Sequence, residues 1–205
     1  MKRNQYTLGK PISFKGNGLH SGIPVTITMR PAPAGSGIIF RRIDLTGAPE
    51  VPAKSEFVTN TLRATTLERG GAKVFTVEHI LSALFALRID NCILEMDAPE
   101  PPVADGGALT FSQMILEAGI MELEEQTDIL TLETSVAVYE DNKFITALPY
   151  DGLRITFTSI NPHPLLGTQM KDFTIDKETY IREIAPSRTI GFTWELEAMR
   201  QMGLG

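Results

Sequence analysis

The segment Thr76-Val77-Glu78-His79, continued to Arg88, decides how this sequence folds. Apolar side chains recur along it with the i, i+3, i+4, i+7 spacing that places them on one face of a helix: Val77, Ile80, Leu81, Leu84 and Leu87. Thr76 is one of the residue types favoured at a helix N-cap. The sequence therefore predicts an amphipathic helix over 76–88, capped by Thr76, whose apolar stripe faces a core.

Glu78 and His79 fall in the first turn of this predicted helix. Backbone N–H groups there lack intrahelical partners, and the helix end carries partial positive charge. We expect this environment to keep a carboxylate ionised and to disfavour an imidazolium. An ionised glutamate beside a neutral histidine combines a general base with a metal ligand. In the alternative interpretation, Glu78 only complements the helix dipole and His79 only packs in the core.

The composition limits the class of protein. The chain has 205 residues, of which 42% are hydrophobic and 21% charged, as expected for a soluble globular protein. Its net charge of −6 argues against general nucleic-acid binding. No apolar run follows Met1 in the manner of a secretory signal, and none is long enough to span a membrane.

The single cysteine and the few histidines limit the chemistry further. Cys92 is the only cysteine, so an intramolecular disulfide is excluded and a reducing, cytoplasmic compartment is favoured. Cys92 lies in an apolar run, which favours a core role over a nucleophilic one. With three histidines in the chain, a metal site would need carboxylates or ligands from elsewhere.

Hydrophobic alternation and turn residues predict an α+β organisation. The first half predicts helices at 76–88 and 108–118 and strands at 24–30, 37–43, 51–57, 59–68 and 92–96. A glycine-rich turn, 16–22, contains His20, which is either a site residue or merely a turn residue. The polar segment 122–126 is interpreted as a linker, which divides the chain into domains 1–124 and 125–205. The second half predicts strands at 129–139, 143–148 and 153–160, a strand or turn at 173–180, and helices beginning at 180 and spanning 192–202, the last stopped by Gly203.

Several blocks of sequence, in order, resemble one enzyme family. The blocks are Gly18-Leu19-His20-Ser21-Gly22, Arg30-Pro31-Ala32-Pro33, Thr76-Val77-Glu78-His79, Ile89-Asp90-Asn91, the stretch Ala98 to Gly106, and Ser187-Arg188-Thr189-Ile190-Gly191-Phe192. Together they resemble the bacterial UDP-3-O-acyl-N-acetylglucosamine deacetylase. The resemblance runs from about Leu8 to Leu204, and blocks matched in order are more specific than any one of them.

The resemblance implies a zinc-dependent amide hydrolase that removes acetate from a UDP-linked, 3-O-acylated glucosamine in the committed step of lipid A synthesis. It implies two similar α/β-sandwich domains with helices packed between outer sheets, a full-length monomer, and no nucleic-acid partner. Glu78 matches the family's general base, His79 its first zinc ligand, and Thr189 a threonine that stabilises the oxyanion. Weaker matches assign substrate contacts to Leu19, to Lys143 near the nucleotide phosphates, and to Ile190 near the acyl passage, where many members carry Phe.

One departure concerns the metal. A catalytic zinc needs three protein ligands, and the family supplies two of them from a His-x-x-x-Asp helix motif. No such motif occurs here, because Pro24, Ala83 and Gly167 stand four residues after the three histidines. The chain therefore resembles the first part of the enzyme, with the second domain incomplete and the remaining zinc ligands expected beyond Gly205. We expect weak zinc binding, little activity and an exposed apolar face in this chain alone; a non-catalytic sugar-nucleotide or acyl-chain scaffold is the alternative.

Overall fold

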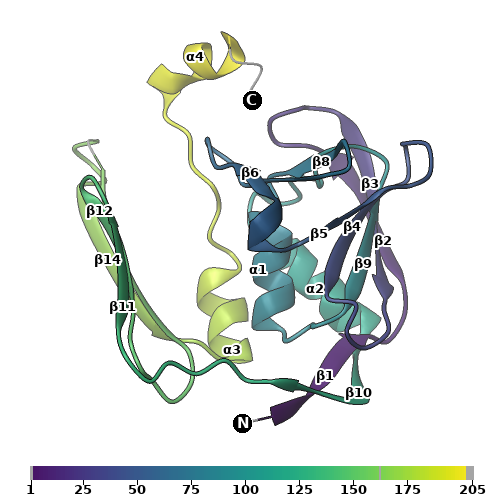
Figure 1. The fold of residues 1–205 in the computed structure, drawn as a ribbon. Helices are drawn as coiled ribbons and strands as arrows, with labels where there is room; N and C mark the ends of the chain where they lie inside the picture. Colours follow the sequence, from purple (N-terminus) through teal and green to yellow (C-terminus); the bar gives the residue numbers. More distant parts are fainter. Residues whose placement is uncertain (1, 162, 202–205) are drawn as a thin grey trace.

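A five-stranded sheet forms one outer layer of the first half (Figure 1). The computed structural model describes residues 2–161 and 163–201, and the sheet order is β2-β3-β9-β4-β5. Its strands are β2 (Ile12–Asn17), β3 (Pro24–Pro31), β4 (Ile38–Arg42), β5 (Glu50–Pro52) and β9 (Cys92–Met96). β4 and β9 run parallel, and the other neighbours are antiparallel. The predicted strands at 24–30, 37–43 and 92–96 are therefore confirmed.

Two helices cover one face of this sheet. α1 (Glu78–Ala86) and α2 (Leu109–Ala118) lie within the two helical ranges that the apolar periodicity predicted. The predicted apolar stripe is buried except for Leu81, which is half-buried, and α2 adds Phe111 and Ile115 to the same core. Strands β3 and β9 contribute the opposite side of the core, because every second residue of each is buried: Val25, Ile27, Met29, Cys92, Leu94 and Met96.

A small second sheet precedes α1. It consists of β6 (Val58–Asn60), β7 (Thr66–Arg69) and β8 (Ala72–Phe75), after a 3-10 turn η1 (Ser55–Phe57). Gly70 and Gly71 both have positive φ, which closes the predicted turn between β7 and β8. The predicted strand over 59–68 is wrong as a single element, because residues 61–65 form a loop between β6 and β7.

The predicted linker is instead a strand. Residues 122–126 lie inside β10 (Ile120–Asp128), which pairs antiparallel with β1 (Lys2–Leu8). Most side chains of β10 are exposed, so the segment lacks the alternation of apolar and polar residues that predicts a half-buried strand. Backbone pairing with the start of the chain stabilises it. The division into domains at 124/125 falls within this strand and remains a prediction.

The second half begins with two hairpins. One is formed by β11 (Val136–Glu140) and β12 (Lys143–Ala147), the other by β13 (Arg154–Ile160) and β14 (Thr168–Thr174). The predicted strand or turn at 173–180 is correct only at its start: residues 173–174 end β14, whereas residues 177–180 begin a helix, where the Asp176 carboxylate accepts a hydrogen bond from the Thr179 N–H. This helix is α3 (Lys177–Thr179), continued by a π-helical turn η2 (Tyr180–Ile184). The predicted helix at 192–202 appears as a 3-10 turn η3 (Thr193–Glu195) and α4 (Leu196–Gln201); Gly203 lies outside the described residues.

Helices lie between the strands of the two halves, as the α+β prediction requires (Figure 1). The buried Tyr180 joins them: its hydroxyl and that of Ser82 on α1 are 2.8 Å apart and share a hydrogen bond. The Ala108 N–H, just before α2, donates to the Ala185 carbonyl at 3.0 Å. In the part of the chain that the structure describes, no helix is long and apolar enough to cross a membrane.

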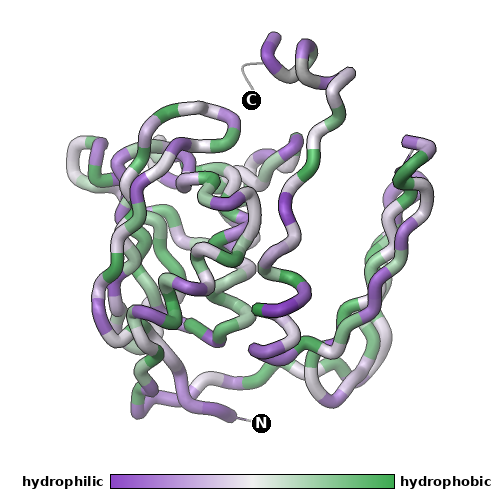
Figure 2. The backbone as a smooth tube through the Cα atoms, turned by 180° about the vertical axis from the view of Figure 1, so that it is seen from behind, coloured by the Kyte–Doolittle hydropathy of each residue, from purple (hydrophilic) through white to green (hydrophobic). Residues whose placement is uncertain are grey.

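Apolar side chains lie exposed on the strands of the second half. Figure 2 shows hydrophobic segments along these hairpins, and Phe144 and Ile145 on β12 are 73% and 72% exposed. Phe157 on β13 is also mostly exposed. Ile145 and its cross-strand partner Val138, which is 61% exposed, lie on the same face of the hairpin, so the expected exposed apolar face is present.

Candidate active site

The start of α1 is built differently from the prediction. The N-cap position is Val77, and no side chain caps the helix there. Thr76 instead adopts a left-handed conformation with a φ of +57°. Its hydroxyl donates a hydrogen bond to Oε1 of Glu100 at 2.7 Å. The predicted N-cap role of Thr76 is therefore wrong, because a partner distant in the sequence takes its side chain.

Glu78 is the first residue of α1 and its side chain is exposed. Its Oε1 accepts a hydrogen bond from the Thr65 N–H, which lies in the loop between β6 and β7. His79 follows and is half-buried. The structure thus presents a carboxylate that solvent can reach, oriented by a backbone donor, beside an imidazole.

The glycine-rich turn packs against the same region. The Glu100 carboxylate accepts hydrogen bonds from the backbone N–H groups of His20 and Ser21 at 2.8–3.1 Å. His20 is 9% exposed, and its Nδ1 has no hydrogen-bond partner among the described residues. Leu19, beside it in the turn, is half-buried. The turn and the start of α1 therefore share one buried carboxylate.

Thr189 is held by its backbone against the loop before α2. Its N–H donates to the Gly106 carbonyl at 2.8 Å, and a Cβ on Gly107 would lie 2.7 Å from the Ser187 carbonyl oxygen. Residues 187–189 therefore lie directly on the loop before α2. Thr189 and Ile190 are both exposed.

An ion pair joins the segment after Thr189 to the loop that contacts Glu78. Nη2 of Arg63 lies 2.5 Å from Oε1 of Glu195. Arg63 is in the β6–β7 loop, two residues before Thr65. In Figure 1 the chain between α3 and α4 runs beside α1 and β6, which agrees with this contact. The structure therefore connects Glu78 with the segment that carries Thr189 and Ile190.

Lys143 is not part of this group. It begins β12, which in Figure 1 lies on the far side of α3 from α1. Its side chain is exposed, and its backbone pairs with Glu140 at the tip of the hairpin. The contacts described here leave Lys143 separate from Glu78 and His79.

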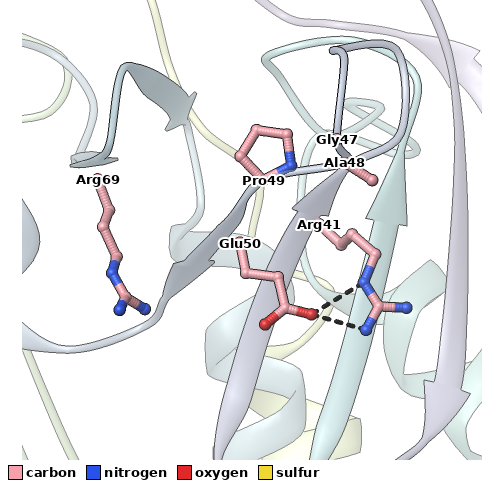
Figure 3. Close-up of a pocket in the computed structure, with 6 residues that line it drawn as sticks. All are labelled: Arg41, Gly47, Ala48, Pro49, Glu50 and Arg69. Carbon is pink, nitrogen blue, oxygen red and sulfur yellow. Dashed lines mark hydrogen bonds and ion pairs between the residues drawn. The ribbon is translucent and has the colours of Figure 1, made fainter.

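A shallow hollow of about 600 Å³ lies elsewhere on the first half (Figure 3). Its lining consists of Arg41, Gly47, Ala48, Pro49, Glu50 and Arg69, and includes none of the predicted site residues. Glu50 accepts hydrogen bonds from Nε and Nη2 of Arg41 at 3.0 and 2.6 Å, and this contact raises the pKa of the guanidinium. Arg41, one of the two arginines that line this hollow, is therefore already paired.

The described residues do not form a complete zinc site. A catalytic zinc requires three protein ligands and an open position. Residues 2–161 and 163–201 contain no group of three or more His, Cys, Asp or Glu side chains that could hold a metal. His79 is thus one prospective ligand without partners there. Cys92 is no substitute, because burial raises the pKa of its thiol to about 12.

Two supports of the site were missed from the sequence. Glu100 is fully buried, yet in the sequence it is one acidic residue among prolines. Thr65 contributes only its backbone N–H, which carries no side-chain signature. The sequence held one signal for Glu100, which is the proline on each side of it. These prolines exclude a regular helix or central strand and so indicate that Glu100 lies in a loop.

Comparisons with known proteins agree with the resemblance. The model of the LpxC family, described as UDP-3-O-acyl N-acetylglycosamine deacetylase, matches residues 5–205. A "Bifunctional enzyme LpxC/FabZ" of Chlorobaculum tepidum is 43% identical over 204 residues, covering 98% of this chain and 44% of that protein. UDP-3-O-acyl-N-acetylglucosamine deacetylases of Myxococcus xanthus and Xylella fastidiosa are 42% and 40% identical, and each alignment covers 98% of this chain.

The chain is shorter than these relatives. It spans 64% of the Myxococcus protein and 67% of the Xylella protein. The family match nevertheless covers nearly the whole chain, and the α+β architecture with helices between strands agrees with it. This chain belongs to the UDP-3-O-acyl N-acetylglycosamine deacetylase family.

Proposed function

We propose that this chain is part of an N-deacetylase that hydrolyses UDP-3-O-acyl-N-acetylglucosamine in lipid A synthesis, with Glu78 as the general base. One observation carries the proposal. Glu78 stands exposed at the first turn of α1, with its Oε1 bonded to the Thr65 N–H and His79 next to it. A base must reach the proton that it removes, and an exposed carboxylate oriented by a backbone donor meets that requirement.

The reaction adds water to the amide carbonyl and breaks the carbon–nitrogen bond, leaving acetate and a free amine. Glu78 accepts a proton from the attacking water, and the leaving nitrogen gains one. The carbonyl oxygen becomes negative in the tetrahedral intermediate. A hydroxyl hydrogen bond from Thr189 stabilises that charge where it develops. The tether of Thr189 to Gly106 supports this role, because it limits the movement of the segment.

Substrate contacts are proposed for three further residues. Leu19 and Ile190 contact the acyl chain, whose burial stabilises binding by about 0.8 kcal/mol for each CH₂ group. Lys143 contacts the nucleotide phosphates as a point charge. Leu19 is supported by its place beside His20 against the Glu100 loop, and Ile190 by its place next to Thr189. For Lys143 the support is its exposed charge and its match to the family.

Zinc is part of the proposal only through His79. The described residues supply no complete ligand set, so further ligands must come from outside them. We expect isothermal titration of this 205-residue chain with zinc to show weak binding at most. Tight stoichiometric binding that is lost in His79→Ala would contradict this expectation. A cytoplasmic location is proposed from the single cysteine, and a monomer from the family resemblance.

A second candidate is a non-catalytic scaffold that binds a sugar nucleotide or an acyl chain. The lack of a three-ligand group among the described residues favours it. It predicts binding of the UDP-linked substrate without release of acetate, even in a protein of the relatives' full length.

The test uses a protein in which this chain is extended to the length of its relatives. We expect it to release acetate, and Glu78→Gln to lower kcat by about 10²–10⁴-fold, the usual contribution of a general base. Glu68→Gln is the matched control, because Glu68 is an exposed carboxylate on β7 with only a distant lysine partner. Acetate release unaffected by Glu78→Gln would refute the assignment of the base. Substrate binding without acetate release would support the scaffold.

A further inference from the structure

Glu100 is a buried carboxylate without a cationic partner among the described residues. Its side chain is fully buried, and it takes part in none of the ion pairs of residues 2–161 and 163–201. A buried charge is costly unless hydrogen bonds compensate for the lost water. Three donors do so here: the N–H groups of His20 and Ser21, and the hydroxyl of Thr76.

The arrangement is specific for a carboxylate. Oε1 receives the Thr76 hydroxyl at 2.7 Å and the His20 N–H at 3.0 Å, and Oε2 receives the Ser21 N–H at 2.8 Å. An ionised carboxylate only accepts, whereas an amide would turn one of these positions into a donor facing another donor. A Cβ on Gly18 would collide with Oε2, so the turn also needs glycine for this close approach.

The donors come from segments that are far apart in the sequence. Thr76 lies 24 residues before Glu100, and His20 lies 80 residues before it. The loop around Glu100 is itself fixed, because the Pro99 carbonyl accepts from the Phe75 N–H at 3.1 Å and the Val103 N–H donates to Asn17 at 2.8 Å. Glu100 therefore sits where the glycine-rich turn meets the entry to α1.

Thr76 needs such a partner. Its φ of +57° is an outlier for a β-branched residue, whose side chain crowds the backbone in the left-handed region. This conformation turns the chain from β8 into α1 and so sets the direction in which Glu78 and His79 point. The hydrogen bond to Glu100 compensates for the unfavourable conformation of Thr76.

We propose that Glu100 is a positioning residue, which acts through Thr76 to hold Glu78 and His79 in place against the His20 turn. The inference rests on the proposed function for its catalytic consequence, but its structural consequence is independent of that function. A residue that only fills the core would stabilise the fold without orienting the start of α1.

The structural arm uses amide NMR spectra of the 205-residue chain. We expect Glu100→Gln and Thr76→Val each to shift the amide signals of Val77, Glu78 and His79, whereas Thr76→Ser, which keeps the hydroxyl, leaves them in place. Glu95→Gln is the matched control, because this carboxylate pairs with Arg30 and Arg41 on the sheet. Unshifted signals in Thr76→Val would overturn the proposal. That variant is nearly isosteric, so it also serves if Glu100→Gln does not fold.

The catalytic arm uses the protein in which this chain is extended to the length of its relatives. We expect Glu100→Gln and Thr76→Val each to lower kcat by about 100-fold, the effect of a misplacement of roughly 1 Å, with KM unchanged. The double variant should be no worse than Glu100→Gln alone, because the contact that Thr76→Val removes is already disturbed in Glu100→Gln. If the unsubstituted protein releases no acetate, the proposed function fails and the NMR arm alone decides about Glu100. Full kcat in Thr76→Val would count against a positioning role.

Discussion

Arg63 and Glu195 are 132 residues apart in the sequence and form an ion pair with a nitrogen–oxygen distance of 2.5 Å. The pair joins the loop that bonds to Glu78 with the segment that follows Thr189. It links the part of the chain that holds the proposed base to the part that carries the proposed oxyanion donor.

The pair makes this link sensitive to pH. The Arg63 guanidinium holds the pKa of Glu195 below its ordinary value of 4.5. A carboxyl with a lowered pKa stabilises the folded contact above the ordinary value, and that contribution is lost as pH falls through the folded value. We expect the fluorescence of Trp194, the only tryptophan, to change in a step below pH 4.5. The step should be absent in Glu195→Gln and should move to higher pH in Arg63→Gln, where the guanidinium no longer lowers the pKa of Glu195.

His163 provides the check on that measurement. Its ring is stacked on that of Trp194 with the centroids 5.5 Å apart, so it is a second influence on the fluorescence. The low-pH step should persist in His163→Gln, because the Arg63–Glu195 pair is intact there. A low-pH step that persists in Glu195→Gln would show that the fluorescence change does not report on the Arg63–Glu195 ion pair.

Leu84 and Phe85, neighbours on α1, should differ sharply in their contribution to stability. Leu84 is buried, whereas Phe85 is 71% exposed. Leu84→Ala leaves a cavity in the core and should lower the free energy of unfolding by about 2–5 kcal/mol. Phe85→Ala should change it by less than about 0.5 kcal/mol. Urea titration of both variants measures the difference, and equal effects would contradict the burial of the apolar stripe.

Gly18 should tolerate no side chain. A Cβ there would overlap Oε2 of Glu100 and Oγ of Ser21, and both atoms are held by hydrogen bonds. Gly18→Ala is therefore expected to lower the melting temperature measured by circular dichroism. Gly191→Ala is the control, since nothing lies within 4 Å of its added Cβ. Similar melting temperatures for Gly18→Ala and the unsubstituted chain would mean that the turn can move away from Glu100.

The Cys92 thiol should be inert in the folded chain. Burial raises its pKa from 9.0 to about 12, so almost no thiolate exists at pH 8. A colorimetric disulfide reagent should titrate no thiol in buffer and one thiol per chain in denaturant. Rapid reaction without denaturant would contradict the placement of β9 in the core.

The exposed strands of the second half should promote self-association. Phe144 and Ile145 present apolar surface on β12 without cover among the described residues. We expect this chain to form larger species as its concentration rises, measured by light scattering after size exclusion. Phe144→Ser combined with Ile145→Thr should reduce the association, whereas Phe85→Ala should not. A monodisperse monomer at high concentration would refute this prediction.

Local patterns predicted the elements whose side chains face one core. The i, i+3, i+4 recurrence from Val77 to Leu87 located α1, and β-type alternation located β3. The same reasoning failed for β10, because its exposed side chains show no period and its partner β1 lies more than a hundred residues away. Strand pairing at that separation is a tertiary event with no local signal.

In the site, too, features with a local sequence pattern were predicted and those set by tertiary contacts were not. Sequence reasoning placed Glu78 and His79 together at the start of a helix, where the structure has them. It assigned Thr76 to the helix cap, because the competing acceptor, Glu100, becomes its neighbour only in the folded chain. The donor from Thr65 was equally invisible, since it is a backbone group.

The pairing of β1 with β10 has a consequence for synthesis. Lys2 lies opposite Asp128, so β1 leaves the ribosome long before its partner strand β10 has been made. Contacts this distant in sequence form slowly, because a long loop must close before they contribute. The charged and amide side chains of β1 matter during this interval. They keep the unpaired strand hydrated, so it is less prone to associate with apolar segments before β10 is available.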